Sequence, residues 1–310
     1  MASRALLAVA LALAGAVVLA VPGQATRIVS RDVKSPLLQV DAKNQALVTY
    51  AAGGAKHRAL YWGAVNASPP SKSKAQVKFR ENLNYKGAVG KNVCSAAKFA
   101  ADPVAKQLPL LVAGCKMPDG SYWALQAWRR LEPNYGLNAW LPYQNSTELH
   151  VSHWSGELPK LEVYQTWGTG NVPRLFGRFT YAGSPVYGFE VSAVGAPEDT
   201  YARNVYFDTL DSAYGAGWRR ENGILTHTGT GAFCYLVGPH DRFPAGYPSA
   251  PRPSGAGKGY RATVLGPGVT PIVRWEEPAL PPFNPSDANQ VALRQQRTDL
   301  LRSFNDGQCK

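Results

Sequence analysis

The side chains best suited to acid–base chemistry gather in the second half of the chain. They are five carboxylates: Glu198, Asp199, Asp208, Asp211 and Glu221. A glycoside hydrolase needs two carboxyl groups across a cleft, one as acid and one as base or nucleophile. Asp208 and Asp211 are candidates for these two roles. The alternative is structural, because Asp199 and Asp211 can begin turns and Glu221 can offset the arginines that precede it.

Histidines and a cysteine offer two other kinds of chemistry. His150 and His153 would share one face of a helix, but a strand places them on opposite faces, and two ligands fall short of the usual zinc set. Cys94 could be a nucleophile with either histidine as base. The sequence has no Gly-x-Ser-x-Gly, His-Glu-x-x-His, Cys-x-x-Cys or EF-hand pattern. We therefore predict no catalytic residue, no metal site and no cofactor.

Aromatic side chains beside arginines form a more informative pattern. Trp123, Trp128, Trp140, Trp154 and Trp167 fall close together, with four tyrosines among them. Tryptophan and tyrosine present flat apolar faces with a polar edge, which suits sugar rings, and arginine suits carboxylates or phosphates. We predict a binding face made of the following residues: Trp123, Trp128, Arg129, Arg130 and Trp154. The alternative for each tryptophan is burial in the core of a β domain.

The charge of the chain narrows the class of partner. The 310 residues include 33 Lys and Arg against 21 Asp and Glu, a formal charge of +12, yet only 17% are charged and 45% are hydrophobic. This composition excludes a disordered chain and a coiled coil. The basic residues form small clusters at 56–58, 72–80, 129–130 and 219–220. For an exported protein we expect a glycan or an anionic cell-wall polymer as partner, and no nucleic acid.

The first 25 residues have the layout of an export signal. Arg4 precedes an apolar run from 5 to 21, and small residues lead to Ala25. This pattern predicts a signal peptide cleaved after Ala25; the alternative is an uncleaved membrane anchor, for which the run is short. Because Arg4 is the only charged residue before the predicted cut, cleavage lowers the formal charge from +12 to +11. The predicted location is extracellular.

Export predicts that the cysteines pair. The four cysteines are Cys94, Cys115, Cys234 and Cys309. An even number in an oxidising compartment indicates two disulfides, with three possible connectivities. Cys94 with Cys115 and Cys234 with Cys309 is the most local pairing.

Turn residues and alternating patterns predict a mostly β fold in several parts. Residues 26–44 are expected to be a leader, and 45–168 an aromatic-rich β domain. In this domain we expect hairpins around Gly53-Gly54 and around residues 117–120, and a strand at 77–80. A further strand pair is expected at 147–154 and 158–167. Residues 169–277 form a second, sandwich-like β domain, and 278–310 a Pro-rich linker with a C-terminal helix at about 287–304. Ser286 or Asn284 is the expected cap of that helix, which should dock through Leu293, Leu300, Leu301 and Phe304.

Part of the second domain resembles the carboxypeptidase-regulatory-like (transthyretin-like) β-sandwich family. The resemblance rests on 175–193, with its Gly-x-Pro-Val turn at 183–186, on the glycine-and-strand step at 229–237 and on the closing strands at 260–275. It implies a β-sandwich at about 170–275 that serves as an accessory module for rigidity or binding, and residues 199–222 depart from it. The stretches 60–66 and 119–126 resemble exported proteins of high-GC Gram-positive bacteria.

These patterns together predict a secreted, basic β protein that binds rather than catalyses. It would act at the cell surface or outside the cell. The alternative function is a carbohydrate- or wall-active hydrolase that uses carboxylates between 199 and 221.

Overall fold

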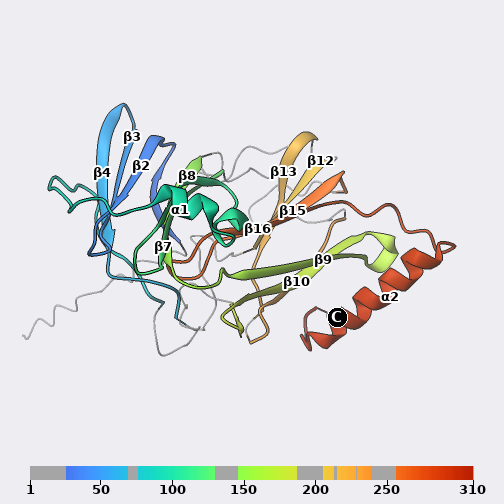
Figure 1. Cartoon of the computed structure of the whole chain (residues 1–310). Coiled ribbons are helices and arrows are strands. Elements are labelled where there is room, and N and C mark those ends of the chain that lie inside the picture. Colours follow the sequence, from blue (N-terminus) through green and yellow to red (C-terminus); the bar gives the residue numbers. More distant parts are fainter. Residues whose placement is uncertain are drawn as a thin grey trace, which may run out of the picture.

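A computed structural model of the chain describes residues 26–68, 76–129, 146–186, 205–212, 215–227, 229–238 and 256–309 (Figure 1). This part is mostly antiparallel β structure and ends in a helix, as the sequence predicts. The strands form four sheets, which face each other in pairs. None of the helices in these ranges has the length and hydropathy needed to cross a membrane.

The first sandwich contains two of these sheets. One has the strand order β1-β8-β7-β6, with bounds Arg27–Arg31, Thr147–Trp154, Tyr122–Arg129 and Leu111–Lys116. The other has the order β2-β3-β4-β5, with bounds Lys34–Val40, Ala46–Ala52, Ala55–Trp62 and Arg80–Asn82. Side chains from both sheets share one core, which includes Val48, Tyr61, Trp123 and Val151. Alternating side chains therefore bury one face of each sheet here.

The two hairpins predicted from turn residues are present. Gly53 and Gly54 both have positive φ and join β3 to β4, which explains why glycine occupies both positions. Between β6 and β7, the amide of Met117 donates to Ser121 and that of Gly120 donates to Met117. Gly120 has a φ of 87°, a conformation that glycine adopts without steric cost.

The second sandwich pairs a sheet centred on β10 with a sheet centred on β12 and β15. In the first sheet β10 pairs with β9, β11 and β14; the bounds of β9, β10, β11 and β14 are Lys160–Trp167, Pro173–Tyr181, Ser184–Pro185 and Ala232–Leu236. The second sheet has the order β13-β12-β15-β16, with bounds Gly215–Ile224, Val205–Ser212, Gly259–Val264 and Val273–Pro278. Phe179, Phe207, Phe233 and Val264 belong to the core between them.

Three expectations about the first half were wrong. Residues 26–44 are not a leader without regular structure, because they contain β1, which pairs with β8, and β2, which pairs with β3. Strands form at 147–154 and at 160–167, but they do not pair with each other. Strand β8 lies between β7 and β1, and β9 pairs along its length with β10. The short turn at 155–159 therefore leads from one sandwich into the other. The strand expected at 77–80 is displaced to β5, Arg80–Asn82.

The segment 199–222, which departs from the resembled family, contributes to the centre of the second sandwich. From Val205 onward it forms β12 and β13, and β12 pairs with β13 on one side and β15 on the other. The expected hairpin at 175–193 is described as far as Val186, with positive φ at Ala182 and Gly183. Residues 187–193 lie outside the described ranges.

The C-terminal helix and both disulfides agree with the predictions. Helix α2 spans Ala288–Ser303 and is capped by Asp287, not by Ser286 or Asn284. It lies along the outer side of β9 and β10 (Figure 1), where Leu301 and Phe304 pack on Phe176. Cys94 bonds to Cys115 and Cys234 to Cys309. The remaining helices are short: α1 at Ala96–Ala101, and the 3-10 turns Ala105–Gln107 and Thr169–Asn171.

Hydrogen bonds and aromatic contacts join the two sandwiches. The buried connection between β15 and β16 runs against the first sandwich, where the Gln126 amide bonds both to the carbonyl and to the N–H of Ile272. The His153 amide donates to Val269. Trp128, at the end of β7, contacts Tyr206 of β12 edge-on, with ring centroids 4.9 Å apart. The two sandwiches therefore share a packed boundary.

Candidate functional site

The tryptophans predicted to form a binding face lie in the protein interior. Trp123 and Trp154 are 0% exposed and Trp128 is 4% exposed. They also fall in three different clusters. Trp123 stacks on Phe79 and His153, Trp154 stacks on Tyr122, and Trp128 lies between the sandwiches. A buried ring cannot stack on a sugar. All three tryptophans therefore pack in the core of the structure, which was the alternative to a binding role.

These tryptophans are buried, contrary to the predicted binding face, because β7 and β8 are covered on both faces. Adjacent strand residues point to opposite faces, yet Tyr122 and Trp123 are both buried, because one face contacts the opposite sheet and the other contacts Phe99 of α1. Arg129 is exposed at the end of β7, and Arg130 lies outside the described residues. The four predicted residues that the structure describes therefore do not share one surface.

The two histidines on β8 lie on opposite faces and belong to separate networks. The Nδ1 atom of His150 lies 2.8 Å from the Thr26 hydroxyl. The Nδ1 atom of His153 lies 2.6 Å from the Ala64 carbonyl oxygen, and its Nε2 atom lies 3.2 Å from the Ser121 hydroxyl. Burial lowers the pKa of His153 to about 4, against a smaller opposing effect of the Ala64 carbonyl. Their placement on opposite faces agrees with the sequence analysis.

Of the five carboxylates proposed for a hydrolase, the three that the structure describes do not meet across a cleft. Asp208 and Glu221 are 2% and 0% exposed. Asp208 forms an ion pair with Arg220 at 2.5 Å; burial raises the pKa of Asp208, and Arg220 opposes that shift. Asp211 is exposed and accepts from the Gly217 amide at 2.8 Å, as the turn interpretation expects. Glu198 and Asp199 lie outside the described residues.

Asp208 belongs to a row of charges on the face of the β13-β12-β15-β16 sheet that points away from the β10 sheet. Its Cα partners are Arg220 on β13 and Arg261 on β15, and Arg261 is paired in turn with Glu276 on β16. The Arg261–Glu276 ion pair is 2.9 Å long. We call these four residues the charge ladder. Because directly opposed side chains on a sheet face interact, the ladder stabilises strand pairing at this position.

A surface that sequence analysis located only in part is the outer face of the β2-β3-β4-β5 sheet. Its outward positions carry Lys34, Lys56, Arg58 and Arg80, which we call the cationic face. The outward residues of these strands include no carboxylate, and none of the four cations forms an ion pair within the described part of the chain. Lys34, Lys56 and Arg80 are exposed and Arg58 is half-buried over the Tyr85 ring.

The cationic face also has apolar and aromatic surface. Trp62 is half-buried on the same side and pairs in register with Arg80. Leu37 is 63% exposed on β2, in register with Thr49, which in turn pairs with Arg58. A hollow of about 460 Å³ is lined by Leu37, Thr49, Lys56 and Arg58, among others. The sequence signal for this face was the pair of basic residues at 56 and 58. Because these residues are two positions apart, a strand directs both side chains to the same face.

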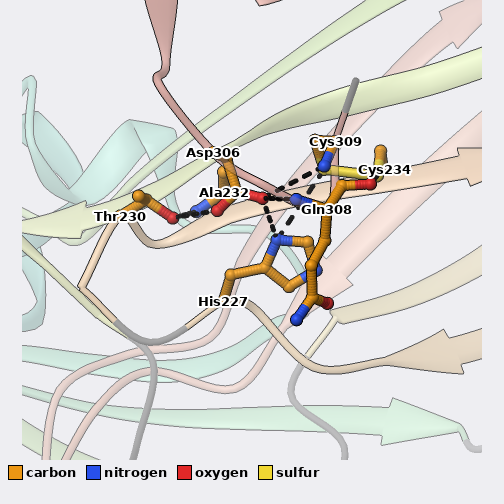
Figure 2. A network of polar contacts seen from close by, with 7 residues as sticks. All are labelled: His227, Thr230, Ala232, Cys234, Asp306, Gln308 and Cys309. Carbon is orange, nitrogen blue, oxygen red and sulfur yellow. Dashed lines mark hydrogen bonds and ion pairs between the residues drawn. A yellow bond between two sulfur atoms is a disulfide. The ribbon is translucent and has the colours of Figure 1, made fainter.

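A second feature that sequence analysis missed lies where the chain end meets the second sandwich (Figure 2). The His227 ring nitrogen Nδ1 lies 2.6 Å from the Oδ1 atom of Asp306. The Thr230 hydroxyl donates to the other oxygen of Asp306 at 2.6 Å, and the amides of Gln308 and Cys309 donate to Oδ1. Burial raises the pKa of Asp306, but these hydrogen bonds outweigh burial and hold it below its usual range.

Comparisons with protein-family models, with curated proteins and with solved structures found no match to this chain. The resemblance to carboxypeptidase-regulatory-like sandwiches therefore stays a prediction.

Proposed function

We propose that this protein is exported and binds an anionic cell-wall polymer through the cationic face, without catalysis. One observation carries the proposal: a sheet face of the first sandwich presents Lys34, Lys56, Arg58 and Arg80 with no carboxylate among its outward residues. Proteins usually intersperse both signs of charge on their surfaces, and a face of one sign attracts an oppositely charged partner.

The arrangement of the cations suits a polymer with repeated negative charges. Lys56 and Arg58 are two residues apart on β4, which separates their Cα atoms by roughly 7 Å. Because strands hold them in register, little backbone entropy is lost when several groups bind at once. Trp62, which is in register with Arg80 at the end of β4, supplies a flat apolar surface for a sugar ring. The shared chemistry of the partner is therefore a saccharide or polyol chain that carries phosphate or carboxylate groups.

Two further features support action outside the cell. Residues 1–25 have the order of charge, apolar run and small residues that typifies an export signal. Two disulfides are present, and structural disulfides persist mainly in oxidising compartments. The buried positions of Asp208 and Glu221 do not favour the hydrolase alternative.

Retention on immobilised polymers across a salt series tests the proposal. The columns would carry a polymer of sugar phosphates, a polymer of uronic acids, and a neutral glucan. We expect salt-sensitive retention on one or both anionic columns. The triple variant Lys56→Gln, Arg58→Gln, Arg80→Gln should make the dependence of log affinity on log salt less steep by roughly two. Retention on the neutral glucan alone would contradict the charge-based proposal.

A matched control removes the same charge elsewhere on the first sandwich. Lys98, Lys106 and Arg129 are exposed, and no ion pair of theirs occurs in the described ranges. The triple variant Lys98→Gln, Lys106→Gln, Arg129→Gln should bind like the parent. Equal losses in the two triple variants would show that net charge, and not the cationic face, causes retention.

A further inference from the structure

Four side chains of types that bind metal converge on the disulfide at the chain end (Figure 2). His227 follows β13, Cys234 lies in β14, and Asp306 and Cys309 follow α2. Ligand atoms of His227, Asp306 and Cys309 all lie within 4.8 Å of one another. The sulfur of Cys234 is bonded to that of Cys309 and so belongs to the same group. In the part of the chain that the structure covers, this is the only such group of three or more.

The spacing of Cys309 and His227 is close to that of neighbouring ligands in a tetrahedral zinc site, whereas His227 and Asp306 lie closer together. Zinc binds sulfur at about 2.3 Å and histidine nitrogen or carboxylate oxygen at about 2.0–2.2 Å, which places neighbouring ligand atoms about 3.3–3.8 Å apart. The Sγ atom of Cys309 lies 3.9 Å from Nδ1 of His227, and Nδ1 lies 2.6 Å from the Asp306 carboxylate. The two cysteine Cα atoms are 5.6 Å apart, so rotation about the side-chain bonds can separate the sulfurs without moving the backbone.

The carboxylate is already held in position by groups outside the ligand set. Thr230 and the amides of Gln308 and Cys309 donate hydrogen bonds to Asp306. Such outer contacts orient the ligands of metal sites and strengthen binding. A hollow of about 770 Å³ reaches His227, Cys234 and Asp306 from the surface, and the His227 side chain is 21% exposed. An ion can therefore reach the group through this hollow.

We propose that reduction of the Cys234–Cys309 disulfide converts this group into a binding site for one Zn²⁺. A dithiol reductant breaks the S–S bond, delivers two electrons and two protons, and becomes a disulfide itself. Zn²⁺ then displaces the two thiol protons to solvent. It is bound by the two thiolates, by the Asp306 carboxylate and by Nδ1 of His227, whose remaining ring proton moves to Nε2.

The proposal gives the chain end two interchangeable attachments. Cys309 and Asp306 follow the helix, whereas Cys234 and His227 belong to the sandwich that the helix covers. The disulfide holds α2 in oxidising surroundings, and the metal would hold it in reducing ones. The Cys94–Cys115 disulfide provides an internal control, because in the described residues its sulfurs do not belong to a metal-ligand group. This inference is independent of polymer binding by the cationic face.

Metal titration of the full-length protein, with and without a phosphine reductant, tests the proposal. We expect the reduced protein to bind one equivalent of Zn²⁺, to show the visible absorption of a tetrahedral thiolate site with Co²⁺, and to bind no metal when oxidised. Zinc should also protect Cys234 and Cys309, but not Cys94 and Cys115, from alkylation, as determined by peptide mapping.

Ligand variants separate this site from nonspecific thiol binding. His227→Ala and Asp306→Asn should each lower zinc affinity at least tenfold, whereas the variant Cys94→Ser, Cys115→Ser should bind zinc like the parent. Equal protection of all four cysteines would overturn the proposal. So would unchanged affinity in both ligand variants, or a reduced chain that unfolds and binds no zinc.

Discussion

The Arg220 Nε atom lies 2.5 Å from Oδ1 of Asp208, and both side chains are buried where the second sandwich meets Trp128. The guanidinium carbon of Arg220 lies 4.8 Å from the centre of the Tyr206 ring and 5.7 Å from that of Trp128. A carboxylate held in this way is part of the packing between the sandwiches. This ion pair explains why Asp208, a candidate catalytic carboxylate in the sequence, has a structural role.

Removing only one member of the Asp208–Arg220 pair should destabilise the protein strongly. Asp208→Ala leaves a buried guanidinium without its partner, which costs about 3–5 kcal/mol. The double variant Asp208→Leu, Arg220→Met should lose less than the sum of the single changes, because the unpaired charge is gone. Urea unfolding of the parent, Asp208→Leu, Arg220→Met and the double variant measures the coupling between the two side chains. A loss below about 1 kcal/mol for Asp208→Ala would contradict a buried pair.

Two tryptophans of the first sandwich should affect different properties. Trp123→Ala removes a fully buried ring and should cost about 3–5 kcal/mol of unfolding free energy, while retention on the anionic polymer stays unchanged in the folded protein. Trp62→Ala, on the cationic face, should cost less stability and weaken retention. Urea unfolding and the salt series measure the two effects. If Trp123→Ala weakened retention and Trp62→Ala did not, Trp123 and not Trp62 would belong to the binding site.

His153 should make the protein less stable as the pH falls. Its pKa is lowered from 6.5 to about 4 by burial, so between these values the unfolded chain binds a proton that the folded chain does not. The contribution of His153 to the free energy of unfolding is therefore fully present above about pH 6.5. It decreases by about 3 kcal/mol as the pH falls from 6.5 to 4.

The variant His153→Gln isolates this effect, because glutamine can still donate to the Ala64 carbonyl but does not titrate. Urea unfolding from pH 4 to pH 7 should show a shallower decline for the variant than for the parent. If the two proteins lose the same free energy across this window, His153 is not the titrating group.

Gly177 should tolerate no side chain. A Cβ atom there would lie 1.8 Å from the Glu162 carbonyl oxygen on the paired strand and 2.6 Å from the Phe233 ring. Backbone on a central strand cannot move away easily, so Gly177→Ala should cost at least about 3 kcal/mol. Gly307→Ala is the matched control, since a Cβ there meets nothing within 4 Å, and should change stability by less than about 1 kcal/mol. Thermal unfolding measures both, and similar midpoints would show that the strands can separate at Gly177.

Local features were predictable because their causes are local. The turns at Gly53-Gly54 and at residues 117–120 depend on the conformational preferences of a few adjacent residues, and both hairpins are present. The C-terminal helix was predicted from its apolar stripe and flanking residues, although Asp287 caps it in place of Ser286 or Asn284. The disulfides followed from choosing the most local pairing.

Strand partners were less predictable because they form between distant segments. The strands at 147–154 and 160–167 are neighbours in sequence with a short connection, which favoured a hairpin. Strand β8 pairs instead with β1, more than a hundred residues earlier, and β9 pairs with β10. Turn residues do not specify these partners, because strand pairing depends on which face of each strand is buried against distant segments.

The sequence by itself determined the mostly β class, the positions of hairpin turns, the number of cysteines and the excess of positive charge. Those properties follow from composition and from neighbouring residues. Only the tertiary structure decided which side of each strand meets water. Alternation predicts that Trp123 and Trp128 face opposite ways, but packing on both faces of β7 buries both. It also brings His227 and Asp306 together from distant parts of the chain, and leaves Lys56 exposed and Arg58 half-buried on the outward side of β4.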